Sequence, residues 1–299
     1  ERGSCMSVEP GTPVVRAGFV VHSGRPAAVD AARFAARLLH ERGVQLVLLR
    51  RDADELDLGV DVTAVDRGAF VADTDVVLSF GGDGTFLRAA HRCRDAGVPV
   101  LGVNLGRVGF LAEVEVPLLE AAIERLVSGE HTIEPRATIE AVVHDAAGVE
   151  IARAWALNDV AVEKTARQRV LLMELDIAGQ TFASVPADAI VLATATGSTA
   201  YALSAGGPIL SPRVPATLVT PVAPHSLFDR TVVCAPDEDV RVRVLPDQEP
   251  AVLSVDGRDP IGVPAGGDVT VRGDGRPVRL LRVDPPHFYE LVRRKFSLR

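Results

Sequence analysis

The pattern of apolar residues changes near residue 133, and this change limits what the chain can fold into. Before it, short apolar runs alternate with segments of helical periodicity; after it, the apolar runs are short and several alternate with polar residues. Alternating strands and helices predict a parallel sheet covered on both faces. Short alternating runs separated by turn residues predict an all-β structure. The 299 residues suffice for two such domains, since one domain takes roughly 150 residues.

In the first part, apolar runs predict buried strands, and Ala- and Leu-rich periodic segments predict helices. The expected strands are residues 17–21, 44–49, 75–80 and 98–103, and the expected helices are residues 27–41, 86–96 and 117–128. This pattern favours a Rossmann-like parallel-sheet domain.

In the second part, β-type runs follow one another with turn residues between them. The expected strands are residues 138–143, 154–157, 169–177, 189–194, 240–244, 251–255, 268–272 and 278–283. We therefore expect an α/β domain over residues 12–133, completed by residues 284–299, and a β-rich, sandwich-like domain over residues 134–283. The helix-like segment HFYELVRRKF near the end would pack on the first domain.

Charge and composition exclude several classes of protein. The net charge is −8 and no long basic run is present, which argues against nucleic-acid and membrane-surface binding. No apolar run approaches the roughly 18 residues of a membrane helix, and the polar first residues contain no signal-peptide core. The three cysteines have no metal-ligand spacing, as is typical of a cytoplasmic protein with free thiols.

A glycine-rich turn, Gly81-Gly82-Asp83-Gly84-Thr85, directly follows one predicted strand and precedes a helix. Glycines there let backbone N–H groups approach an anion, and a helix N-terminus favours negative charge. Phosphate is the natural ligand, so a carboxylate at Asp83 needs another task, and accepting a proton is one. Alternatively, Asp83 caps the helix. The spacing matches neither the common phosphate-binding loop nor the standard dinucleotide fingerprint.

Two further segments carry candidate ligand contacts. Residues 194–201, TATGSTAY, combine hydroxyls with small side chains and one of only two tyrosines. Such a run suits a ribose or a phosphate, and it is equally compatible with a Ser/Thr-rich loop between strands. Asn104 follows a predicted strand at the edge where α/β proteins place ligands. It either bonds a ligand or caps a turn.

Taken together, these segments resemble the NAD kinases. The residues that carry the resemblance are GGDGTFLRA (81–89), GVNLGRVGFLAE (102–113), LND (157–159), TATGSTAYALSAGGPI (194–209) and PHSL (224–227), in the family's order. The resemblance implies an enzyme that transfers a phosphoryl group from ATP, or from polyphosphate, to the 2′-hydroxyl of the adenosine ribose of NAD, forming NADP. It further implies Mg²⁺ or another divalent cation, brought largely by the donor, and a homo-oligomer, a dimer or a tetramer.

The resemblance also assigns roles in the first domain. Asp83 is the family's proton acceptor. Gly81, Gly82, Gly84 and Thr85 would face the dinucleotide or the donor phosphates, and Arg88 would balance negative charge, unless it is simply an exposed helix arginine.

In the second domain, the family's Asn-Glu pair falls on Asn158-Asp159, whose carboxylate is one methylene shorter. Asp188 would bond the nicotinamide end of NAD, either in its own site or in that of a neighbouring subunit. Ala195 stands where the family has proline, which removes a restriction on the backbone. The expected contacts with NAD are Asn158, Asp159, Arg169, Asp188, Thr196, Gly197, Ser198, Thr199, Ala200, Tyr201, Ser204 and Ala223.

Other interpretations stay open at this point. His225 lacks partners with metal-ligand spacing, so a structural hydrogen bond is expected of it. Asp256-Gly257-Arg258 reads as a hairpin turn. A diacylglycerol or sphingosine kinase also carries GGDGT but lacks the TGSTAY segment. A sugar kinase resembling phosphofructokinase shares GGDG but not a β-rich second half, and an NAD-binding regulatory module would not need Asp83.

Overall fold

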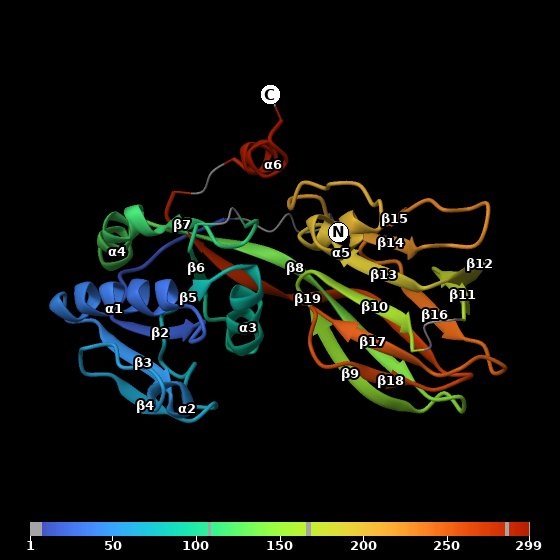
Figure 1. Ribbon diagram of the computed structural model, residues 1–299, viewed down its shortest axis with the longest axis horizontal. Coiled ribbons are helices and arrows are strands. Elements are labelled where there is room, and N and C mark those ends of the chain that lie inside the picture. The colour runs from blue at the N-terminus through green and yellow to red at the C-terminus, as the bar shows by residue number, and fades with distance from the viewer. Residues whose placement is uncertain (1–7, 107–108, 166–168, 285–286, 299) are drawn as a thin grey trace. The chain divides into compact units, whose positions relative to one another are not determined.

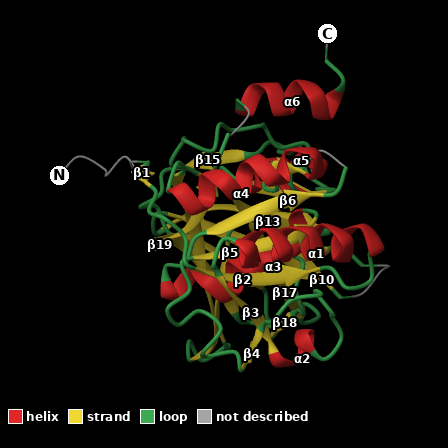
Figure 2. Ribbon diagram, turned by 90° about the vertical axis from the view of Figure 1, so that its left-hand side faces the viewer, coloured by secondary structure: helices red, strands yellow, loops and turns green. Residues whose placement is uncertain are grey.

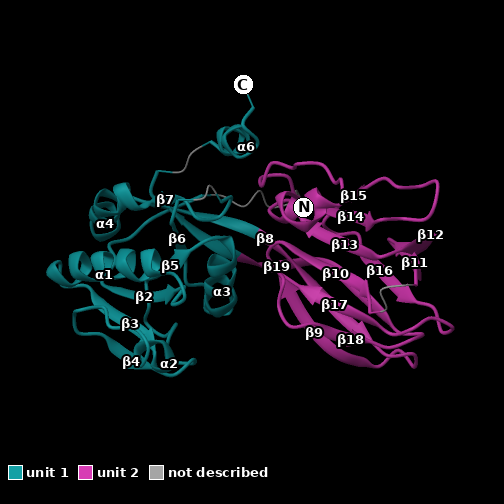
Figure 3. Ribbon diagram, in the orientation of Figure 1, with its two compact units in different colours: residues 1–136, 278–299 teal, residues 137–277 magenta. Residues whose placement is uncertain are grey.

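The computed structural model describes residues 8–106, 109–165, 169–284 and 287–298. Arg107 and Val108 of the GVNLGRVGFLAE segment lie outside this set. The chain divides into two compact units, which are shown in separate colours in Figure 3. Unit 1 comprises residues 1–136 and 278–299, and unit 2 comprises residues 137–277.

Unit 1 is built on a parallel sheet of buried strands (Figure 1). Its order is β4 (Thr63–Val65), β3 (Gln45–Leu49), β2 (Arg16–Val21), β5 (Val76–Gly81) and β6 (Val100–Asn104). The end of β19 (Asp268–Arg282) runs parallel to β6, as does β7 (Val114–Glu115). Every residue of β5 and β6 is buried, as expected of a sheet covered on both faces.

Helices α1 (Pro26–Glu41), α3 (Asp83–Cys93) and α4 (Leu119–Ser128) lie along these strands (Figure 2). Helix α1 buries five alanines, whose small side chains let it approach the sheet closely: Ala28, Ala31, Ala32, Ala35 and Ala36. They share a core with Phe19, Leu78 and Phe80 of the sheet and with Ile123 of α4. The remaining helical segments are α2 (Arg50–Ala53), α6 (Phe288–Phe296) and the 3-10 turns η1 (Arg94–Ala96) and η2 (Val116–Leu118).

Unit 2 contains two antiparallel sheets that enclose one apolar core. One has β12 (Gln180–Ala187), β11 (Leu171–Ile177), β16 (Val240–Val244) and the start of β19 in order, with β8 (Thr132–His144) and β9 (Glu150–Ala156) joined to it. The other has the order β15 (Val232–Cys234), β14 (Thr217–Val222), β13 (Ala189–Thr194), β10 (Asp159–Lys164), β17 (Ala251–Val255) and β18 (Ile261–Val263). Met173 and Val242 of the first sheet share the core with Ile190 and Leu253 of the second, so the sandwich is confirmed.

Several local features differ from the expectations or add to them. Helix α3 begins at Asp83 rather than at residue 86, because Gly84 and Thr85 continue the helical turn. The two strands expected at 268–272 and 278–283 form one strand, β19, which pairs with β16, β8 and β6. The hydroxyl-rich segment contains a 3-10 turn, η3 (Gly197–Thr199), and a short helix, α5 (Tyr201–Ser204). A short strand, β1 (Glu9–Pro10), pairs with β8.

The helices of the described residues are short. None of them is long and apolar enough to cross a membrane.

Candidate functional site

The glycine-rich turn joins β5 to α3 in unit 1. Gly81 ends the strand, Gly82 is the N-cap residue and makes no side-chain cap bond, and Asp83 is the first residue of the helix. Asp83 is therefore not the N-cap, and that alternative is wrong. A carboxylate in the first turn of a helix lies in the favourable field of the helix dipole.

The glycines of this turn have two different functions. A Cβ at Gly81 would lie 2.2 Å from Oγ1 of the buried Thr85, so the absence of a side chain lets Thr85 pack against the strand end. A Cβ at Gly82 or Gly84 would meet no protein atom within 4 Å. At these two positions glycine leaves the backbone N–H groups open to an approaching anion.

The Asp83 carboxylate accepts hydrogen bonds from three consecutive backbone N–H groups. Phe110 donates to Oδ2 at 3.0 Å, while Leu111 and Ala112 donate to Oδ1 at 3.2 and 3.4 Å. Gly109 is required beside them, because a Cβ there would lie 2.3 Å from Oδ1. An ionised carboxylate offers about four acceptor positions, two on each oxygen, and the Phe110 N–H uses one of the two on Oδ2.

The other candidate residues of unit 1 are Asn104 and Arg88. Asn104 is buried and ends β6 directly opposite Gly81 in the register of β5 and β6. Both therefore lie at the carboxyl ends of parallel strands, where α/β folds bind ligands. Arg88 is exposed on α3, one turn beyond Thr85.

In unit 2, the turn that contains Asn158 and Asp159 is held by the carboxylate of Asp256. Oδ2 accepts the backbone N–H of Leu157 at 2.9 Å, and Oδ1 accepts those of Asn158 and Asp159 at 2.8 and 3.2 Å. Asp256 itself has a φ of 47°, a conformation that Asp tolerates better than most residues. The expected Asp256-Gly257 turn therefore also holds the Asn158-Asp159 turn in place, which its sequence alone did not reveal.

The hydroxyl-rich segment packs against the same turn. A Cβ at Gly197 would lie 1.9 Å from the backbone oxygen of Asn158, so only glycine fits there. Thr194 links the two segments, since its hydroxyl donates to Leu157 O at 2.6 Å and accepts the Gly197 N–H at 3.0 Å. The structure therefore brings the LND and TATGSTAY segments together.

The hydroxyls of this segment are used largely within it. Ser198 is fully buried, donates to Ala195 O at 2.7 Å and accepts the Leu210 N–H at 3.0 Å. Thr199 donates to Thr196 O at 3.3 Å. These bonds hold the backbone of the segment in place, although Ala195 replaces the family's proline. Ala200 is half-buried, and Tyr201 and Ser204 are exposed.

The carboxyl group of Asp159 has a pKa well above its usual range. It is 8% exposed, and the Tyr201 N–H donates to its Oδ2 over 3.4 Å. Burial, followed by the negative charge of Asp256, raises the pKa of Asp159 to about 7. A carboxyl group with such a pKa changes its charge near neutral pH, as functional carboxyls often do.

Glu163 lies on the same face of β10 as Asp159, because side chains alternate along a strand. It accepts a hydrogen bond from the Tyr201 hydroxyl, and burial together with the charge of Glu163 raises the pKa of Tyr201. Sequence reasoning missed both Glu163 and Asp256. Glu163 could have been found from its position four residues after Asp159, because residues an even number apart lie on the same face of a strand.

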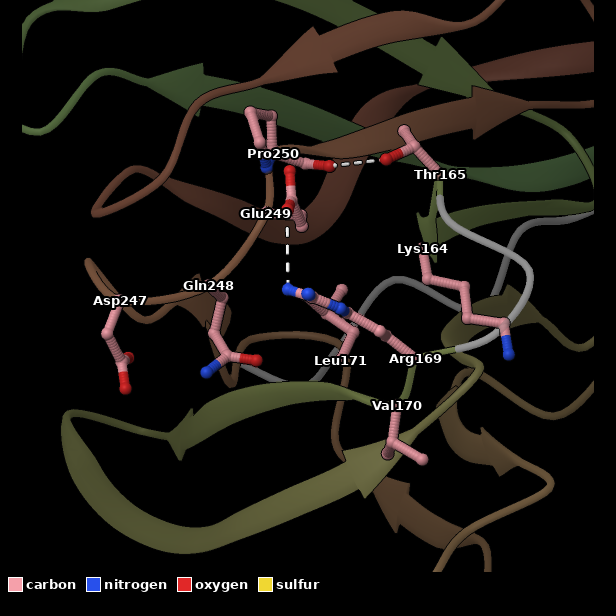
Figure 4. A pocket seen from close by; sticks show the side chains of 9 residues that line it. All are labelled: Lys164, Thr165, Arg169, Val170, Leu171, Asp247, Gln248, Glu249 and Pro250. Carbon is pink, nitrogen blue, oxygen red and sulfur yellow. Dashed lines mark hydrogen bonds and ion pairs between the residues drawn. The ribbon is translucent and has the colours of Figure 1, made fainter.

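Asp188 and Arg169 lie at the other end of β10. Asp188 forms an ion pair with Lys164 and accepts the Lys164 N–H through its backbone oxygen at 3.0 Å. Lys164 and Arg169 both line an open pocket with a volume of about 330 Å³ (Figure 4). There Arg169 pairs with Glu249 at 3.5 Å.

Two other candidates lie on the surface of unit 2. Ala223 is exposed with a φ of 46° and follows Val222, whose oxygen accepts the Asp188 N–H at 2.9 Å. His225 is exposed, and its backbone N–H donates to Pro186 O at 2.7 Å. Within the described part of the chain, no hydrogen bond of its imidazole is found, so the structural bond of His225 is the one made by its backbone.

The described residues contain no group of three or more His, Cys, Asp or Glu side chains that could hold a metal ion. Mg²⁺ commonly keeps several water ligands and binds through one or two carboxylates together with the phosphates of its substrate. A metal that arrives on the phosphoryl donor would not require such a group.

Comparison with known proteins identifies the family of both parts of the chain. Residues 17–131 match the family model of the ATP-NAD kinase N-terminal domain, and residues 157–283 match that of the ATP-NAD kinase C-terminal domain. NAD kinase 2 of Streptomyces coelicolor is 40% identical over 287 residues, covering 95% of each chain. The NAD kinase of Mycobacterium tuberculosis is 38% identical over 292 residues, covering 94% of this chain and 95% of the relative.

Solved structures agree with this assignment at the level of the fold. Yeast NADH kinase complexed with NADH superposes with a TM-score of 0.88 at 24% identity, over 96% of this chain and 89% of the yeast chain. An NAD kinase from Archaeoglobus fulgidus in complex with ATP gives a TM-score of 0.72 at 21% identity, over 94% and 98% of the two chains. On the evidence of both family models and of relatives at about 40% identity across the chain, this protein belongs to the NAD kinase family.

Proposed function

We propose that this chain transfers the γ-phosphoryl group of ATP to the 2′-hydroxyl of the adenosine ribose of NAD, forming NADP. The observation that carries the proposal is the similarity of this chain, over 95% of its length, to proteins named NAD kinase. The lipid-kinase alternative is not supported, because both family models and the curated relatives are NAD kinases.

Asp83 acts as the general base of this reaction. The ribose hydroxyl is a weak nucleophile, so the reaction needs an acceptor for its proton as the new O–P bond forms and the bond between the β- and γ-phosphates breaks. The three N–H groups of Phe110, Leu111 and Ala112 hold the Asp83 carboxylate in one orientation. Its remaining acceptor position on Oδ2 then receives the ribose proton.

The glycine-rich turn binds phosphate groups through its backbone. Gly82 and Gly84 leave N–H groups accessible at the start of α3, and Arg88 adds positive charge one turn later. A Mg²⁺ ion bound to the donor would offset charge on the transferring group. Polyphosphate is the second candidate donor, since the same backbone N–H groups would donate hydrogen bonds to its phosphates.

Unit 2 supplies the contacts that bind and orient NAD. Tyr201, with its exposed ring, stacks on a base of the dinucleotide, while Asn158 and Asp159 bond its polar groups. Gly197 and Ser198, which are buried, also hold the shape of the segment that makes these contacts. The remaining proposed contacts are Arg169, Asp188, Thr196, Thr199, Ala200, Ser204 and Ala223.

We also propose a homo-oligomeric protein that acts in the cytoplasm. The family resemblance supports the assembly, and the sparse, buried cysteines Cys93 and Cys234 are compatible with a reducing compartment.

The test is incubation of the purified chain with NAD and Mg²⁺ together with ATP in one reaction and polyphosphate in another, with detection of NADP. NADP formed with ATP supports the proposal, and NADP formed only with polyphosphate changes the donor. A chain that forms no NADP with either donor, yet binds NAD, would be the regulatory module instead.

A further inference from the structure

The loop from Gly109 to Glu115 contacts two parts of unit 1 at once. On one side, its N–H groups at Phe110, Leu111 and Ala112 bind the Asp83 carboxylate. On the other side, its side chains contact the C-terminal segment, residues 282–284 and 287–296, at three points. The loop therefore connects Asp83 to a part of the chain some two hundred residues away in sequence.

The first contact is aromatic. The ring of Phe110 packs against that of Phe288 in α6, with ring centroids 6.3 Å apart. Lys295, two turns further along α6, places its ammonium group 5.7 Å from the centre of the Phe110 ring, within the range of a cation–π interaction. The residue that donates to Oδ2 of Asp83 is thus held by both ends of α6.

The second contact is a buried ion pair. Glu113 and Arg282 lie 2.8 Å apart, with side chains 4% and 8% exposed. The other carboxylate oxygen of Glu113 accepts the backbone N–H groups of Val283 and Asp284 at 3.1 and 3.0 Å. Arg282 also pairs with Glu134 at 2.8 Å, so the C-terminal segment is anchored where it meets the loop.

The third contact lies on the surface, where Arg294 pairs with Glu115 at 2.7 Å and both side chains are 45% exposed. No described residue of α6 is buried. The helix is therefore kept on the loop by a small number of side-chain contacts, and changing them alters the support of the loop without opening a core.

We propose that the C-terminal segment positions Asp83 for proton transfer, with Phe288, Arg294 and Glu113 acting as positioning residues through the loop Gly109–Glu115. This inference rests on the proposed function of Asp83 as the base. A general base must lie within hydrogen-bond reach of the proton that it accepts. A displacement of about 1 Å in a catalytic group can cost as much as 100-fold in rate, so loss of this support lowers turnover.

The first experiment uses surface variants that leave the core intact. We expect the double variant Phe288→Ala/Arg294→Ala to lower kcat by about 10-fold, while KM for NAD stays within about 2-fold because the proposed NAD contacts lie in unit 2. Phe288→Leu should restore most of the lost rate. Arg293→Ala is the matched control, since Arg293 is an exposed arginine of α6 whose side chain forms no ion pair or hydrogen bond with the other described residues. A double variant with the kcat of this control would overturn the proposal.

The second experiment separates positioning of Asp83 from a general effect on the protein. In an Asp83→Asn background the same double variant should cause no further loss, because residues that act through one group are not additive. If kcat falls as much in the Asp83→Asn background as in the wild type, the double variant affects catalysis by a route other than Asp83. Glu113→Gln, which removes the charge at nearly constant shape, should behave like the double variant, provided that its thermal unfolding shows a folded protein.

The third measurement is independent of activity, so it separates this inference from the proposed function. Amide hydrogen exchange at Phe110, Leu111 and Ala112 should become about 10-fold faster in Phe288→Ala/Arg294→Ala and stay unchanged in Arg293→Ala. Equal protection in the three proteins refutes the link between α6 and the loop, whether or not the wild type forms NADP. A wild type without NADP formation refutes the proposed function instead.

Discussion

The backbone N–H of Asn158 donates to the Asp256 carboxylate over 2.8 Å, across 98 residues of sequence. This bond, with those from Leu157 and Asp159 to the same carboxylate, sets the backbone of the turn that is expected to contact NAD. Two carboxyl groups, Asp159 and Asp256, are thereby brought close to one another.

Asp83→Asn should keep NAD binding and remove most of the turnover. Asparagine retains the size and acceptor oxygen of the side chain but cannot take the ribose proton, and a general base contributes about 100- to 10,000-fold in rate. NADP formation and NAD affinity by calorimetry measure the two effects. Turnover near that of the wild type would exclude Asp83 as the base, whereas loss of NAD affinity would assign it a binding role.

Asp159 should make the stability of the protein depend on pH. Its pKa rises from 3.8 to about 7 on folding, so the folded state favours the protonated form. That preference stabilises the protein fully below about pH 4 and is lost as the pH rises through 7. Between these values the free energy of unfolding falls by about 1.4 kcal/mol for each pH unit. From pH 5 to pH 7 it falls by roughly 2–3 kcal/mol.

Chemical unfolding at pH 5 and pH 8 tests this dependence. Asp159→Asn cannot ionise, so its free energy of unfolding should change less over the interval than that of the wild type. Asp256→Asn should reduce the dependence in part, because it removes the neighbouring charge that raises the pKa of Asp159. Identical pH profiles for wild type and Asp159→Asn would contradict the assignment.

Gly197→Ala should destabilise unit 2 and weaken NAD binding. The added Cβ would lie 1.9 Å from the backbone oxygen of Asn158, and backbone cannot move aside as a side chain can. Overpacking of this kind costs about 1–3 kcal/mol or more. Thermal unfolding and NAD affinity are the measurements. Gly262→Ala in the same unit is the control, since its Cβ would meet nothing within 4 Å, and an equal effect of both changes would refute the argument.

Asp256→Ala should lower stability through three backbone groups at once. The N–H groups of Leu157, Asn158 and Asp159 would lose their acceptor, and a buried donor without a partner costs about 1–3 kcal/mol. Alanine also tolerates the φ of 47° less well than Asp. Denaturant unfolding measures the loss, which Asp256→Asn should show to a smaller degree. Wild-type stability of the alanine variant would mean that water replaces the carboxylate.

Several features of this protein follow from neighbouring residues alone. The change of periodicity near residue 133 predicts a parallel sheet with helices followed by a β-sandwich, and both are confirmed. The buried run before Gly81 and the glycines themselves predict a strand, a turn and a helix in that order, as β5 and α3 are found. These features depend on hydrophobic periodicity and turn chemistry, which act over a few residues.

Other features depend on residues far apart in the sequence. The amide groups that bind Asp83, the carboxylate of Asp256 beneath Asn158 and the contact between Gly197 and Asn158 all join segments that meet only after the sheets have formed. The pKa of Asp159 likewise follows from burial and from Asp256, neither of which its sequence neighbours show. Only tertiary packing brings such groups together and removes water from them, and that is why the partners of the predicted site residues had to be found in the structure.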